Sequence, residues 1–265
     1  MTAQPLHTHV FGTDDPDAPV VLALHGLTGH GRRWGRLADH LPGVRLLAPD
    51  LLGHGHSSWA PPWGAADHAT AVAETVKALV PANRSIVVVA HSFGSVVALA
   101  LARRCPDLVA GLVLLDPAHG LDPAQARVYA EATLAHWGYA DADAAIAAKR
   151  AEGWYDVPTA ILIDELDHHL MSDDAGGVVW RVSPPAVATA WSEMARPFRL
   201  PPESVPTHVV VAGRVDPPFV RPEFLAACAA ERPTTVTVHH VDTEHMVPFL
   251  APDLCARLVL DLVHS

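Results

Sequence analysis

Charged residues are scarce in this chain of 265 residues, making up 18% of it, and no run of basic residues occurs. The 29 Asp and Glu outnumber the 18 Lys and Arg, which gives a formal net charge of -11. Such a surface offers little clustered positive charge to bind phosphates or an anionic bilayer. We therefore expect neither nucleic acid nor a membrane as a partner.

Cysteine is rare too, and its three residues are Cys105, Cys228 and Cys255. Their number is odd, and no C-x-x-C or zinc-type spacing occurs, so we expect buried, reduced thiols. No apolar stretch reaches the roughly 18 residues that a spanning helix needs. Residues 1–9 lack the charged and apolar regions of a secretion signal. These absences predict a soluble, cytoplasmic protein.

Histidine, in contrast, is abundant, with 18 residues, which raises the question of a metal site. Neither H-E-x-x-H nor a Cys/His cage is present. His168 and His169 lie among acidic residues, but neighbours on a helix point about 100° apart and cannot easily share one ion. We expect a solvated acidic face there and predict no metal site.

Half of the residues are hydrophobic, enough for one globular unit with a full core. Short β-branched runs recur, each followed by turn residues and a segment of helical periodicity, as in βαβ units. The sequence therefore predicts an α/β fold with a mostly parallel central sheet flanked by helices. The expected strands are 20–24, 44–48, 86–90, 112–115, 208–212 and 235–241.

This alternation stops between about residues 118 and 200, where acidic, Ala-rich sequence such as 141–152 replaces the strand signals. We expect an inserted helical cap at 118–200, between core segments 1–117 and 201–265. The insertion holds all three tyrosines and four of the seven tryptophans, Trp137, Trp154, Trp180 and Trp191. Because pockets are mostly apolar, we expect a few of these rings to line a substrate pocket and most to pack the cap.

A serine follows the third expected strand, in the sequence Ala90-His91-Ser92-Phe93-Gly94, and an almost wholly apolar helix follows it. A strand, a sharp turn with small neighbours and a buried helix form the context of a nucleophile elbow. The turn holds the serine in a strained conformation with its hydroxyl presented at the top of the sheet. The pattern is G-x-S-x-G with alanine first, and it predicts Ser92 as the nucleophile.

Two glycine-containing loops precede the elbow. His25-Gly26-Leu27 follows the first expected strand, and a D-x-x-G-x-G-x-S loop at 50–57 follows the second. Together with the elbow they resemble the α/β-hydrolase superfamily, in its serine-nucleophile, esterase- and lipase-like branch with a helical cap. The resemblance implies that the backbone N–H groups of Leu27 and Phe93 form an oxyanion hole. It also implies that the loop at 50–57 is structural, with no catalytic role for its aspartate and histidines.

The resemblance places the acid and the base in later loops. Asp216, in a G-x-x-D sequence after the strand at 208–212, is the predicted acid, and Asp116, after the strand at 112–115, is the alternative. His245, in the loop after the last expected strand, is the predicted base. The order Ser92, Asp216, His245 is that of this fold.

A serine elbow differs from the carboxylate elbows of dehalogenases and epoxide hydrolases. We therefore expect a carboxylesterase-like enzyme that cleaves small to medium esters through an acyl-enzyme and needs no cofactor. A lactonase, thioesterase, carbon–carbon bond hydrolase or perhydrolase with the same triad stays open. So does a small-molecule receptor with little turnover. The expected partner is a small ester-like molecule, and neither length nor charge sets the oligomeric state.

Overall fold

The computed structural model describes residues 5–135, 137–174 and 176–265, so residues 1–4 of the amino-terminal segment lie outside the described residues. Seven strands form the central sheet in the order β1-β3-β2-β4-β5-β9-β10. All neighbours are parallel except β1 and β3. The strands are β1 (Thr8–Gly12), β2 (Val20–Leu24), β3 (Arg45–Pro49), β4 (Ile86–His91), β5 (Val109–Leu115), β9 (Thr207–Ala212) and β10 (Val236–Val241).

The predicted mostly parallel sheet is confirmed, and β2 shows why the sequence forms it. Val20, Leu22 and Leu24 belong to the core cluster on one face, and Val21 and Ala23 belong to the cluster on the other. Successive side chains of a strand point to opposite faces, so a strand that is apolar throughout must be covered on both sides.

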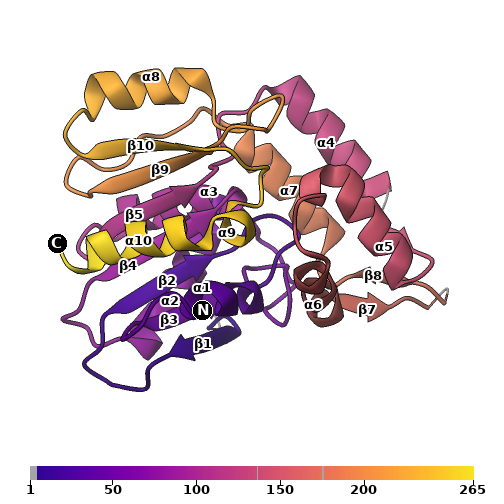
Figure 1. Ribbon diagram of the computed structural model, residues 1–265, viewed down its shortest axis with the longest axis horizontal. Helices are drawn as coiled ribbons and strands as arrows, with labels where there is room; N and C mark the ends of the chain where they lie inside the picture. Colours follow the sequence, from indigo (N-terminus) through magenta and orange to yellow (C-terminus); the bar gives the residue numbers. More distant parts are fainter. Residues whose placement is uncertain (1–4, 136, 175) are drawn as a thin grey trace.

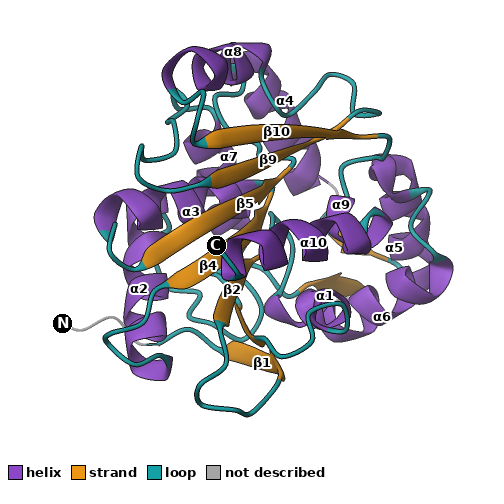
Figure 2. Ribbon diagram, turned by 60° about the vertical axis from the view of Figure 1, so that its left-hand side comes forward, coloured by secondary structure: helices purple, strands orange, loops and turns teal. Residues whose placement is uncertain are grey.

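Helices supply that cover on both faces (Figure 2). On one face lie α2 (Ala65–Leu79), α3 (Phe93–Arg104) and α8 (Pro222–Glu231). On the other lie the short helix η1 (Gly31–Trp34), α1 (Gly35–Ala38), α9 (Val247–Leu250) and α10 (Pro252–Val263). No helix among residues 5–135, 137–174 and 176–265 has the length and apolar character needed to cross a membrane.

The segment between β5 and β9, which we call the cap, gathers at one end of the sheet (Figure 1). Its described residues form four α-helices, the helical turn η2 and three short antiparallel strands in the order β6-β8-β7. These are α4 (Pro123–Ala135), β6 (Gly138–Tyr139), α5 (Ala142–Lys149), η2 (Arg150–Trp154), α6 (Thr159–His169), β7 (Leu170–Ser172), β8 (Val178–Trp180) and α7 (Pro184–Met194).

The small sheet is an addition to the helical cap that the sequence predicted. Gly176, with φ +92°, and Gly177 lie just before β8. The N–H of Asp173 donates to the carbonyl of Gly177 at 2.9 Å, which closes the turn from β7 to β8. Paired glycines between short apolar runs are a hairpin signal.

A buried ion pair joins the cap to the core. Arg33, in η1, donates to Glu165, in α6, through Nε at 3.0 Å and again through Nη2. His30 Nε2 lies 3.2 Å from the other oxygen of Glu165. Burial alone would raise the pKa of Glu165, but Arg33 and His30 outweigh it and hold the pKa well below its usual range. Removing one partner of such a pair typically costs about 3–5 kcal/mol.

Candidate active site

Ser92 occupies the sharp turn between β4 and α3. Its φ and ψ are 54° and -121°, a conformation that few non-glycine residues adopt. A Cβ on Gly94 would come within 2.5 Å of the carbonyl oxygen of Leu24, so only glycine lets the first turn of α3 pack this closely. The strand, strained serine and buried helix are those expected of a nucleophile elbow.

The loop after β2 lies directly against this turn. A Cβ on Gly26 would come within 2.9 Å of Ser92 Cβ, so the loop touches the serine at a point where only glycine fits. Leu27 follows Gly26 in this turn. Among the described residues, the N–H of Leu27 donates no backbone hydrogen bond. Phe93 is the first residue of α3, where an N–H has no acceptor within the helix. Two N–H groups near the serine are thus available to an oxyanion.

His25 fixes the shape of this loop. Its Nδ1 lies 2.8 Å from the carbonyl oxygen of Gly26, and its Nε2 lies 2.9 Å from the N–H of Leu51. Since Nε2 accepts from a backbone N–H, the ring proton is on Nδ1. Burial and the neighbouring His54 hold the pKa of His25 well below its ordinary value. His25 is therefore neutral and links two loops through its two hydrogen bonds.

Asp50 organises the loop after β3. It accepts hydrogen bonds from the N–H of Gly31 at 2.7 Å and of His56 at 2.9 Å. Burial would raise the pKa of Asp50, but the neighbouring His9 and the hydrogen bonds from His56 and Gly31 outweigh it and keep the pKa well below its usual range. A Cβ on Gly55, at φ +54°, would overlap the carboxylate at 2.2 Å. These contacts agree with a structural role for this loop.

Asp116 and His245 form the closest acid–base pair of the site. His245 Nδ1 donates to Asp116 Oδ2 at 2.6 Å, and Asp116 Oδ1 accepts from the N–H of Ala212 at 3.0 Å. Asp116 is only 1% exposed. A proton held on Nδ1 leaves Nε2 with a lone pair, which is the state that a general base requires.

The prediction that Asp216 stands behind His245 is wrong. Asp216 is exposed in the loop after β9, whereas the alternative, Asp116, holds the ring. The two loops follow adjacent parallel strands, β5 and β9, so both end at the same edge of the sheet and the sequence could not separate them. The loop of Asp216 instead supplies Phe219, whose ring centroid lies 4.6 Å from that of His245.

His91 holds the backbone of His245 in place, a contact that the sequence analysis missed. Its Nε2 lies 2.8 Å from the carbonyl oxygen of His245, which can only accept, so Nε2 carries the proton. The same carbonyl accepts from the N–H of Val247 at 2.8 Å. Burial and the neighbouring His245 hold the pKa of His91 well below its ordinary value. The only signal in the sequence was its position beside Ser92.

A series of aromatic rings leads from His245 into the cap. Tyr129 lies 5.9 Å from Phe219 and stacks on Trp191 at 5.2 Å, measured between ring centroids. Trp154 and Trp180, in contrast, are buried in a cluster that joins the cap to Met246 and Phe249 of the core, and Trp137 packs against that cluster. Trp191 is the one of the four tryptophans named from the sequence that belongs to this series of rings.

Comparisons with known proteins agree with the predicted fold and family. A model of the "Alpha/beta hydrolase family" matches residues 20–258. "Lipase LipV" of Mycobacterium tuberculosis (strain ATCC 25618 / H37Rv) is 42% identical over 254 residues, 96% of each chain. "Esterase Rv0045c" of the same strain is 34% identical over 123 residues, 46% of this chain and 39% of that protein. The crystal structure of E-2-(acetamidomethylene)succinate hydrolase has a TM-score of 0.80 at 20% identity, covering 98% of this chain and 95% of that one, and it shows the fold alone.

Proposed function

The chain belongs to the alpha/beta hydrolase family, and on that premise we propose that it is a serine esterase acting on small to medium carboxylic esters through an acyl-enzyme. Relatives named lipase and esterase support cleavage of an ester bond. The observation that carries the proposal is the hydrogen bond between the His245 ring and the buried Asp116. The backbone carbonyl of His245 is in turn held by His91, the residue next to Ser92.

In the first half-reaction, Ser92 Oγ attacks the ester carbonyl carbon while His245 Nε2 takes the hydroxyl proton, because a neutral serine is a poor nucleophile. The carbonyl oxygen gains the negative charge, and the N–H groups of Leu27 and Phe93 stabilise it. Removing one such donor typically costs about 10²–10³ in rate. Asp116 stabilises the imidazolium, which then protonates the departing alcohol.

In the second half-reaction, His245 takes a proton from water, and the hydroxide formed attacks the acyl carbon bound to Ser92. The tetrahedral adduct collapses, the proton returns to Ser92 Oγ and the carboxylic acid leaves. Both half-reactions use the side chains of Ser92, His245 and Asp116 and the same oxyanion donors.

The preference for small to medium esters rests on the surface of the described chain. Its exposed large hydrophobic residues are dispersed over several elements: Val10, Trp59, Val128, Leu134, Tyr155, Ile163 and Val238. An enzyme that docks on emulsified lipid would need a contiguous apolar patch. The rings of Tyr129, Trp191 and Phe219 lie in series beside His245 and offer apolar surface to a short acyl chain.

The test is turnover of 4-nitrophenyl esters of graded acyl length by the purified protein, beside Ser92→Ala. We expect many turnovers per molecule for wild type, a maximum at short or medium chains and no turnover above background for the variant. Binding of these esters without turnover would favour the receptor alternative. Equal turnover by both proteins would remove Ser92 from the reaction.

A further inference from the structure

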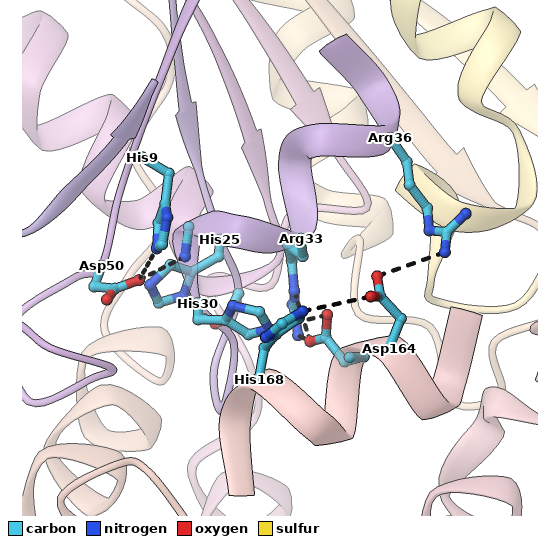
Figure 3. A network of polar contacts seen from close by, with 11 residues as sticks. His9, His25, His30, Arg33, Arg36, Asp50, Asp164 and His168 are labelled. Atoms are coloured by element: carbon cyan, nitrogen blue, oxygen red, sulfur yellow. Dashed lines mark hydrogen bonds and ion pairs between the residues drawn. The ribbon is translucent and has the colours of Figure 1, made fainter. Parts of the chain in front are cut away.

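A cluster of metal-ligating side chains lies outside the active site. His7, just before β1, His9, in β1, and Asp50, just after β3, each have a ligand atom within 4.8 Å of the others. Figure 3 shows His9 directed toward the Asp50 carboxylate. The extended chain places His7 and His9, two residues apart, on the same side, as successive odd positions of a strand must be.

The spacing within the cluster is close to that of a bound cation. His9 Nε2 lies 3.7 Å from Asp50 Oδ1. Tetrahedral zinc with ligand distances of about 2.0–2.1 Å has its ligand atoms about 3.3–3.4 Å apart. The pair thus needs only a few tenths of an ångström of adjustment, and the exposed His7 can turn toward the pair.

The Asp50 carboxylate is already held in a fixed orientation. Its two oxygens accept the N–H groups of Gly31 and His56, and each oxygen keeps a second lone pair for a cation. Outer hydrogen bonds of this kind orient metal ligands and matter for affinity. A cavity of about 290 Å³ beside the cluster, also lined by His30, His56, His168 and His169, leaves room for the ion and its water.

We propose that His7, His9 and Asp50 bind one divalent transition-metal ion, with water completing its coordination. Two imidazoles and one carboxylate suit Zn²⁺, Ni²⁺ or Cu²⁺. From the sequence, no metal site was expected, at His168 and His169 or elsewhere. The proximity of His7 and His9 to Asp50 depends on the antiparallel pairing of β1 with β3, which no local pattern shows.

The ion would tie the edge strand to the loop after β3 and take no part in ester cleavage. β1 and β4, which leads into Ser92, are separated by two strands in the sheet. Three steps of about 4.8 Å place them roughly 14 Å apart. Binding of the metal and hydrolysis of esters are therefore separate properties.

The test is calorimetric titration of the whole chain, produced without a histidine tag and freed of metal by a chelator, with ZnCl₂. Wild type should bind one equivalent, and thermal unfolding should move to higher temperature, because the ion binds the folded state. His7→Gln and His9→Gln should each lose at least about tenfold in affinity, since even outer-shell changes cost 10–100-fold. Both side chains reach the surface, so these variants should fold. Asp50→Asn is avoided because Asp50 organises its loop.

The matched control is His239→Gln. His239 Nε2 lies 3.0 Å from His208 Nδ1, so it also belongs to a histidine pair, but in the described chain that pair has no third ligand. This variant should bind Zn²⁺ as wild type does. Absence of stoichiometric binding by wild type would overturn the proposal. So would equal affinity in His9→Gln and wild type, which would mean diffuse binding to the many histidines.

Discussion

At the residue scale, hydrogen bonds decide which groups of the site can act as acid and base. Both oxygens of Asp116 are engaged, one by His245 Nδ1 and one by the N–H of Ala212. The carboxylate cannot turn without losing one of these bonds, so it fixes the tautomer of His245. Asp216, exposed on the neighbouring loop, makes no such contact with the ring.

Asp116→Asn is expected to lower kcat by about 10⁴-fold, because an amide in place of the carboxylate favours the wrong imidazole tautomer. Asp216→Asn should stay close to wild type. Steady-state kinetics with a 4-nitrophenyl ester, on variants with wild-type circular dichroism, give the ranking. A greater loss in Asp216→Asn would return the acid to the position that the sequence favoured.

His91 is a positioning residue, since it acts on His245 through a hydrogen bond to the backbone carbonyl oxygen of that residue. His91→Leu should lower kcat about 10- to 100-fold with little change in KM, because a small displacement of a catalytic group costs about this much. His91→Gln, which can still donate, should recover part of the loss. If both variants merely unfold more easily while kcat is unchanged, His91 serves packing alone.

At the element scale, the cap places one tryptophan in the series of rings beside His245 and buries others in the cluster that joins the cap to the core. Trp191, in α7, stacks on Tyr129, which lies beside Phe219 and hence His245. Trp180, in β8, is 4% exposed and lies within the cluster that joins the cap to the core. The two rings should therefore respond differently to truncation.

Trp191→Ala should shift the acyl-chain optimum toward longer esters, because the truncated side chain leaves space in the series of rings beside His245. A matched or lost methylene is worth about 1–3 kcal/mol, a 10- to 200-fold preference. The ratio of kcat/KM for a short and a long ester measures the shift. In Trp180→Ala stability should fall while that ratio stays constant, and the same ratio in all three proteins would make Trp191 a packing residue.

The elements differ in how far the sequence could predict them. β2 has the predicted bounds because it is apolar throughout and buried on both faces. β1 was missed because an edge strand of mixed polarity, only partly buried, lacks that signal. The contact of Arg33 with Glu165 spans 132 positions and depends on how the cap seats on η1, which no local pattern encodes.

At the scale of the whole molecule, buried neutral histidines couple folding to pH. Burial lowers the pKa of His54 and of His119 to about 4 and that of His68 to about 3. An unfolded histidine has a pKa near 6.5. Between these values the unfolded chain binds more protons than the folded one.

The contribution of these histidines to the free energy of unfolding should therefore be fully present above about pH 6.5 and fall as the pH drops toward 4. Each such histidine contributes up to about 1.4 kcal/mol per pH unit. Urea unfolding at pH 7, 6 and 5 measures the slope. His119→Phe should reduce the slope of unfolding free energy against pH by the equivalent of about one proton. His119 packs against Phe224, and its Nε2 has no hydrogen-bond partner within the described structure, so an apolar ring should replace it readily. An unchanged slope in this variant would mean that His119 is protonated in the folded state.

The central claim, that Ser92 is activated by His245 and Asp116, is tested most directly by mass spectrometry after reaction with a 4-nitrophenyl phosphonate. Attack of Ser92 Oγ on phosphorus expels 4-nitrophenolate and leaves the phosphonyl group on the serine. We expect one label per chain, on the peptide that contains Ser92, with much slower labelling in Asp116→Asn and none in Ser92→Ala. A label on another serine, or labelling of Asp116→Asn at the wild-type rate, would contradict the account.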